Sequence, residues 1–203
     1  MIKITKKTNP QSFGNMFVVC TKQNFLVIDP CVGFESIKPL VKNKNCVGVF
    51  LTHAHFDHFA EIESFLSQGF NIFLSKHAET NMQNPNTNVS LIFGKSFTAK
   101  VPKQQLKIVK EGDIIKFENL EAKVLELFGH TNCSIGLVLE NHFFCGDFIF
   151  EDSNIGRCDL PTGSPLEMRN SLRKLKNLDE NTIVHSGHGN DFLLKDFTLL
   201  KKN

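Results

Sequence analysis

The chain of 203 residues contains no tryptophan and no tyrosine, so its aromatic packing falls entirely to 20 phenylalanines. Without a phenol, it cannot use any mechanism that needs a tyrosine hydroxyl. It also lacks the roughly 18 consecutive apolar residues that a membrane-spanning helix needs. Its first residues form no apolar segment of signal-peptide length. We therefore expect a cytoplasmic protein without a membrane partner.

Cysteine pairs and a one-signed charge are also missing. The six cysteines form no C-x-x-C pair, and without an export signal they are expected to be reduced thiols. The 23 basic and 21 acidic side chains leave a net charge of +2. No concentrated basic stripe is present, so no nucleic-acid partner is expected. The sequence does not indicate an oligomeric state.

The chain is expected to form one domain over residues 1–203. Its composition, 41% apolar and 22% charged, suits a sizeable buried core. We find no linker rich in Ser, Pro or Gly and no repeat at a solenoid or propeller period.

Short apolar runs alternate with helical patterns along the chain. The runs predict strands at residues 16–20, 24–28, 47–51, 70–74, 114–117, 122–128, 135–139 and 183–184. The first two predict a hairpin. Apolar residues at helical spacing predict a helix after residue 58, and a capping box with proline predicts another from about Pro165 to Asn177. Residues 81–88 are expected to be loop, Asn141-His142 a turn, and the tail after residue 191 a last packing segment. The mixture favours an α/β or α+β enzyme.

The strongest chemical signal is the run from His53 to His58, which holds His53, His55, Asp57 and His58 within six residues. On extended backbone, side chains two apart point the same way, so His53 and His55 can reach one metal ion. Asp57 and His58 would aim elsewhere, which suggests two metal ions. Asp57 could instead only cap the following helix, but capping leaves the three histidines unexplained.

Three more candidate ligands follow predicted strands beside glycine. They are His130 in Gly-His-Thr, Asp147 in Gly-Asp and His188 in Gly-His-Gly. Glycine allows the backbone to approach a ligand closely. Each signal is weak alone, because a single histidine after a strand is more often a surface or core residue. Combined with the run at His53, they favour one metal centre.

This pattern, His-x-His-x-Asp-His followed by His130, Asp147 and His188, resembles the metallo-β-lactamase superfamily. Residues 15–19, 28–30 and 154–161 share the resemblance, and the last run is similar to small single-domain glyoxalase II-like hydrolases. The resemblance implies a four-layer αββα sandwich of two sheets flanked by helices, with the site at one sheet edge.

The resemblance also implies roles for the seven residues. His53, His55 and His130 would bind one metal ion, Asp57, His58 and His188 a second, and Asp147 would bridge the two. The ions would be divalent, with zinc expected and iron or manganese as alternatives. A hydroxide bridging the ions would be the nucleophile, and Asp57 could also accept a proton. Asp29 would orient the ligand loop, or would only end a strand before Pro30.

The implied reaction is hydrolysis of a small-molecule thioester, of the hydroxyacylglutathione hydrolase type. The alternative on the same scaffold is a persulfide dioxygenase with a single iron, and a phosphodiesterase or nuclease ranks third. A metal-free binding module would have lost ligands, whereas all seven positions are filled. Antibiotic hydrolysis is not expected, because secreted relatives place a cysteine where Asp147 falls. Full-length glyoxalase II has an added helical domain that helps bind glutathione, and the stretch after His188 does not provide it.

Overall fold

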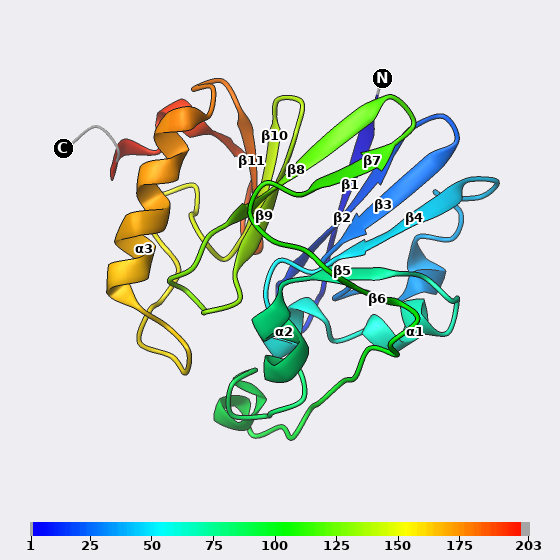
Figure 1. Ribbon diagram of the computed structural model, residues 1–203, viewed down its shortest axis with the longest axis horizontal. Coiled ribbons are helices and arrows are strands. Elements are labelled where there is room, and N and C mark those ends of the chain that lie inside the picture. Colours follow the sequence, from blue (N-terminus) through cyan, green and yellow to red (C-terminus); the bar gives the residue numbers. More distant parts are fainter. Residues whose placement is uncertain (1, 200–203) are drawn as a thin grey trace.

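The computed structural model describes residues 2–199, whose strands form two six-stranded sheets packed face to face (Figure 1). The first sheet has the order β1 (Lys3–Thr8), β2 (Asn15–Cys20), β3 (Asn24–Ile28), β4 (Asn45–Phe50), β5 (Ile72–Leu74) and β6 (Leu106–Ile108). The second has the order β12 (Phe192–Leu193), β11 (Ile183–Ser186), β10 (His142–Gly146), β9 (Ile135–Leu139), β8 (Leu120–Glu126) and β7 (Ile114–Phe117). Strands β3 to β6 are parallel, as are β10 and β11, and the other pairs are antiparallel.

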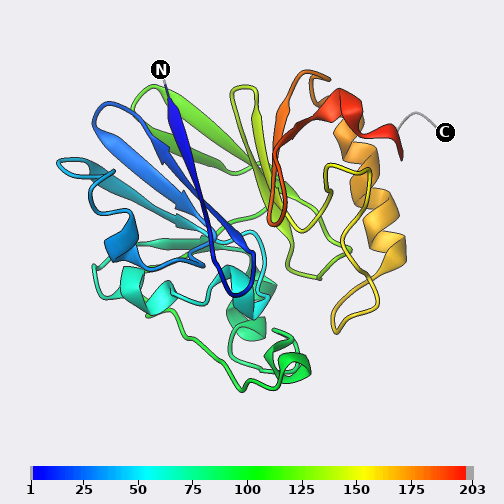
Figure 2. The ribbon, with the colours of Figure 1, turned by 180° about the vertical axis from the view of Figure 1, so that it is seen from behind.

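Helices cover the outer faces of both sheets. Helices α1 (Ile62–Leu66) and α2 (Lys76–Asn81) lie on the first sheet, and α3 (Pro165–Leu172) lies on the second, as the view from behind also shows (Figure 2). The described residues also form short 3-10 helices: η1 (Phe34–Ser36), η2 (Phe56–His58), η3 (Ser90–Phe93), η4 (Arg173–Asn177) and η5 (Leu194–Asp196). The predicted αββα sandwich is confirmed. No helix among residues 2–199 is long and apolar enough to cross a membrane.

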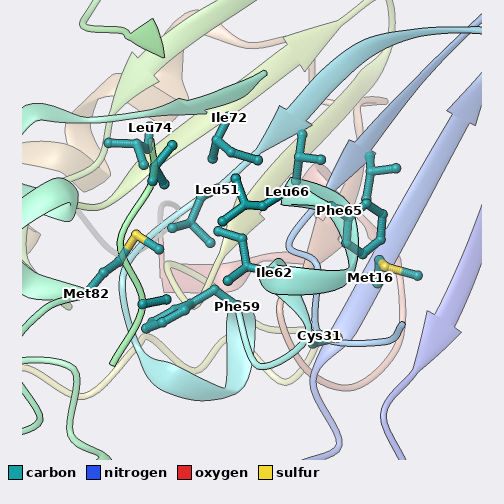
Figure 3. Packing of buried hydrophobic residues seen from close by; sticks show 14 of the residues in the cluster. Met16, Cys31, Leu51, Phe59, Ile62, Phe65, Leu66, Ile72, Leu74 and Met82 are labelled. Carbon is teal, nitrogen blue, oxygen red and sulfur yellow. The ribbon is translucent and has the colours of Figure 1, made fainter. Parts of the chain in front are cut away.

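The hydrophobic core is divided by the sheets into layers. All six residues of β2 are buried, because successive side chains of a strand point to opposite faces and both faces are covered here. Val18 packs toward α1, whereas Phe17 and Val19 pack between the sheets. On the helix side, Phe59 and Phe65 lie against the first sheet (Figure 3). This packing fixes the chain immediately after His58 on a rigid base.

Most predicted elements are confirmed. The hairpin exists as β2 and β3, with Val18 opposite Val27. Helix α3 begins at Pro165, and Oγ of Ser164 accepts a hydrogen bond from the amide of Glu167 at 3.3 Å. Its last predicted turn, to Asn177, is a 3-10 turn.

Some boundaries were wrong. His142 is not in a turn but begins β10; the turn lies at Glu140, whose φ is 52°, and Asn141. Asn81 ends α2 and so does not belong to a loop, and β5 begins at Ile72 and not at Phe70. Helix α2 escaped prediction because it has no apolar stripe, and the edge strands β1 and β6 because one face of each is partly exposed and polar.

Candidate metal centre

The candidate metal centre lies where the two sheets meet at one edge. The loop after β4 carries the residues from His53 to His58, and the second sheet contributes His130 between β8 and β9, Asp147 after β10 and His188 after β11. Backbone hydrogen bonds join the two halves there, from Ile135 to Thr52 at 2.8 Å and from Asn15 to Gly187 at 2.7 Å. The site therefore depends on the packing of both sheets.

The structure brings all seven candidate ligands together. One group consists of His53, His55 and His130, and a second of Asp57, His58 and His188, each with ligand atoms within 4.8 Å of one another. These are the two sets that the family resemblance implies. The remaining group joins Asp147 to His53 and His58, one residue from each set.

Contacts of Asp147 place its carboxylate between the two sets. Oδ1 lies 3.2 Å from Nε2 of His58, and Oδ2 lies 3.5 Å from Nε2 of His188 and 3.7 Å from Nε2 of His130. Asp57 faces the same side, with Oδ2 3.3 Å from Nε2 of His188. The carboxylate thus contacts both sets, through His130 of the first and through His58 and His188 of the second, as a bridging ligand would.

Asp57 does not cap a helix. The residue before the 3-10 turn at Phe56–His58 is His55, and the residue before α1 is Glu61. The capping interpretation of Asp57 was therefore wrong, and its carboxylate is free to serve the site.

A buried carboxylate supports the site from behind. Oδ1 of Asp29 accepts a hydrogen bond from the amide of Thr52 at 2.7 Å, and Oδ2 accepts from the Thr52 hydroxyl at 2.6 Å and from Nδ1 of His58 at 2.8 Å. Asp29 both ends β3 and orients the ligand loop, so the two interpretations of its role hold together.

Hydrogen bonds fix which ring nitrogen each histidine presents to the centre. Because the Thr52 hydroxyl donates to Asp29, Nδ1 of His53 donates to Thr52 at 3.1 Å. Nδ1 of His130 donates to the carbonyl of Arg157 at 2.7 Å, and Nδ1 of His188 donates to the carbonyl of Phe13 at 3.0 Å. When neutral, each of these rings, like that of His58, then presents the lone pair of Nε2 to the centre. His55 differs, since its Nδ1 faces Nε2 of His130 at 3.0 Å.

Burial and neighbouring charges adjust the acidities of the site. Burial, with the nearby His58, lowers the pKa of His53 well below its ordinary value, and burial beside His130 lowers the pKa of His55 to about 3. Burial also opposes a charge on His58, but Asp147 and its other carboxylate neighbours outweigh burial and raise the pKa of His58. Burial alone would raise the pKa of Asp147, but the attraction to His58 outweighs burial and lowers it.

The donor atoms fit divalent metal ions. Nε2 of His53 and Nε2 of His55 are buried without a hydrogen-bond partner, which is costly for polar atoms unless a ligand satisfies them. Two nitrogens that bind the same zinc ion at about 2.0–2.1 Å lie about 3.3 Å apart. Nδ1 of His55 and Nε2 of His130 have a similar separation of 3.0 Å. Imidazole and carboxylate donors without thiolate suit zinc, iron and manganese alike.

The centre opens into a cavity of about 720 Å³. Five of the seven candidate ligands line it, namely His55, Asp57, His130, Asp147 and His188. His53 and His58 lie behind them, with exposures of 1% and 0%, while the side chain of His188 is 28% exposed. A substrate would thus approach from the side of Asp57 and His188.

Sequence reasoning missed the partners that fix the rings. The carbonyls of Phe13 and Arg157 carry no side-chain signature, and only Thr52, directly before His53, could have been suspected. Cys133, close to His130 in the chain, is fully buried and does not line the cavity. Arg157, whose carbonyl holds His130, forms an ion pair with Asp159 at 2.8 Å.

The sandwich and its edge cluster together define a protein of the metallo-enzyme class. The model of the metallo-beta-lactamase superfamily matches residues 9–188. The chain belongs to this superfamily.

Among known proteins, the chain is 34% identical over 168 residues to a hydroxyacylglutathione hydrolase of Wigglesworthia glossinidia brevipalpis, covering 82% of the chain and 57% of that relative. Two solved structures, each 24% identical, share its fold. BLEG-1, a B3 metallo-beta-lactamase, has a TM-score of 0.85 with 98% of this chain and 96% of its own covered. TTHA1623 in a di-iron-bound form has a TM-score of 0.79 with 96% of both chains covered.

Proposed function

We propose that the chain is a metal-dependent hydrolase that cleaves small-molecule thioesters, of the hydroxyacylglutathione hydrolase type. The convergence of seven donor side chains at one end of a single cavity carries the proposal. The 34% identical relative supports the choice of a thioester. The match covers 57% of the length of that relative. The proposal therefore names the thioester class, and a glutathione thioester serves as a test substrate.

In this proposal the seven residues hold two divalent ions, with zinc as the expected metal and iron or manganese as alternatives. Such ions polarise a carbonyl oxygen and lower the pKa of water toward neutrality. The chain contributes the fixed ring orientations and two ionised carboxylates. Asp57, with 18% of its side chain exposed against 13% for Asp147, faces the cavity and can accept the proton that an attacking water loses. Asp147 holds both halves of the centre in register.

The test combines metal analysis with two assays. Release of thiol from S-lactoylglutathione is expected, with loss after chelation and recovery after metal is returned. Oxygen uptake with glutathione persulfide is expected to be absent. Oxygen uptake with one iron per chain and no thiol release would refute the hydrolase and favour the dioxygenase.

A further inference from the structure

The cavity at the metal centre has an apolar outer wall. Most of its lining is apolar, and the apolar side chains along it include Phe13, Phe56, Phe93, Phe150, Ile155 and Leu160. Phe13 and Phe93 are 68% and 64% exposed, which is unusual for phenylalanine. An apolar part of a ligand would cover them.

Two basic side chains also line this cavity, and they differ in their pairing. The guanidinium of Arg157 is held by both oxygens of Asp159, at 2.9 and 2.8 Å. Lys95 makes no ion pair with any carboxylate in the described chain. The acids on the lining, Asp57 and Asp147, face histidines. Lys95 is therefore the cation of the lining that lacks an anionic partner among residues 2–199.

The segment that carries Lys95 is docked onto the ligand loop. The Lys95 ammonium lies 5.0 Å from the centre of the Phe56 ring, and Phe56 separates His55 from Asp57 in the sequence. The Phe56 ring also packs at 5.5 Å from Phe93, and its amide donates to the carbonyl of Asn88 at 3.0 Å. These contacts hold the backbone at Lys95 in a defined position beside the metal centre.

Asn88 keeps this segment in shape. It is fully buried, and its Nδ2 donates to the carbonyls of Met82 at 3.3 Å and Phe97 at 2.7 Å, while its Oδ1 accepts from the amide of Ser90 at 3.0 Å. These hydrogen bonds hold the backbone of the segment in one conformation. Less conformational entropy is then lost when Lys95 binds a ligand.

We propose that Lys95 binds an anionic group of the substrate, a carboxylate or a phosphate, while Phe13 and Phe93 cover its apolar part. The substrate class is then an amphipathic, anionic acyl thioester, and Lys95 is a specificity-determining residue. This inference rests on the proposed function and specifies the substrate for the same site. A lysine ammonium offers three donors and a compact charge, and apolar walls reduce the screening that weakens ion pairs on open surfaces.

The test measures binding of inert thioethers to the metal-loaded protein by calorimetry. Two matched pairs separate the possible anions: S-hexylglutathione with its dimethyl ester for carboxylates, and S-hexyl-4′-phosphopantetheine with S-hexylpantetheine for a phosphate. The protein is expected to prefer the anionic member of at least one pair. Lys95→Gln is expected to weaken binding of that member by about 3- to 10-fold, as for a partly screened ion pair, and to leave its uncharged counterpart unchanged.

Two variants control this measurement. Lys95→Arg is expected to keep most of the preference, and Lys100→Gln, which removes an exposed charge outside the cavity lining, is expected to keep all of it. The inference is overturned if the protein prefers neither anionic member, or if Lys95→Gln weakens both members of a pair equally.

Thiol release is measured separately, so the two proposals can fail independently. Absence of hydrolysis with every acyl thioester would remove the proposed reaction, while the calorimetric preference would still decide the role of Lys95. Hydrolysis together with an unchanged preference in Lys95→Gln would remove the role of Lys95 alone.

Discussion

Oδ2 of Asp29 accepts a hydrogen bond from Nδ1 of His58 across 2.8 Å, and the two side chains are 2% and 0% exposed. The same carboxylate holds the amide and hydroxyl of Thr52. One buried acid therefore positions the loop of ligands from within, without facing the cavity.

Replacing Asp29 with asparagine should weaken metal binding. An amide has only one acceptor oxygen, so it cannot receive the bonds of Thr52 and His58 on both sides. We expect Asp29→Asn to lower metal affinity by about 10- to 100-fold, as for other partners behind a ligand. Competition with a chromophoric chelator measures this, with Glu63→Gln on the exposed face of α1 as the charge-matched control. Equal affinities in the two variants would contradict the role of Asp29.

Asp147→Ala should abolish activity and sharply weaken metal retention while leaving the fold mostly intact. The physical reason is the position of the carboxylate between both sets of ligands. Metal content, thiol release and circular dichroism together measure the effect, with Glu63→Ala as control. Unchanged turnover at matched metal content would reject a bridging role for Asp147.

Gly187→Ala should disturb the centre through space alone. A Cβ at Gly187 would overlap Oδ1 of Asp147 and would lie 2.5 Å from Cε1 of His58. A displacement of about 1 Å at reacting groups can reduce turnover by about 100-fold. Steady-state kinetics and metal analysis measure the loss. Gly33→Ala is the control, because its nearest atom would lie at 3.4 Å, and similar kinetics for both variants would argue against the close fit around Asp147.

The chelated protein should lose stability on acidification, partly through His55. Its pKa is lowered from 6.5 to about 3 in the folded chain, so protons bind the unfolded chain more readily. The stabilising contribution of neutral His55 is present above pH 6.5 and is lost as the pH falls from 6.5 toward 3. One proton corresponds to about 1.4 kcal/mol per pH unit.

Urea unfolding of the chelated protein between pH 7 and 4 tests this contribution. His55→Gln should flatten the decline of the midpoint, whereas His77→Gln, at an exposed position of α2, should leave it unchanged. Parallel curves for wild type and His55→Gln would show that His55 does not contribute.

The seven candidate ligands could be located from the sequence because their spacing is local and their residue types are distinctive. The run from His53 to His58 is visible without a fold, and the glycine contexts of His130 and His188 mark strand ends. Their roles as ligands remain predictions. The two-sheet order was not accessible from periodicity, because pairing such as β10 with β11 joins strands far apart in the chain.

The missed features have a common physical origin. Backbone carbonyls, such as that of Phe13, act through position and not through residue type. Lys95 could not be predicted as a site residue, because only the folded chain brings it close to Phe56. In a sequence, a single lysine in a loop is ordinarily interpreted as a solvated surface charge. Helix α2 is short and has only Ala78 and Asn81 buried, so its sequence shows no amphipathic pattern that would predict a helix.

The division of the donors between the two sheets has a consequence for assembly. His53, His55, Asp57 and His58 come from the half that ends with β6, and His130, Asp147 and His188 from the half that begins with β7. A fragment of either half would hold an incomplete coordination shell with nothing opposite. Capture of the proposed ions would therefore report that the two half-molecules have joined during folding.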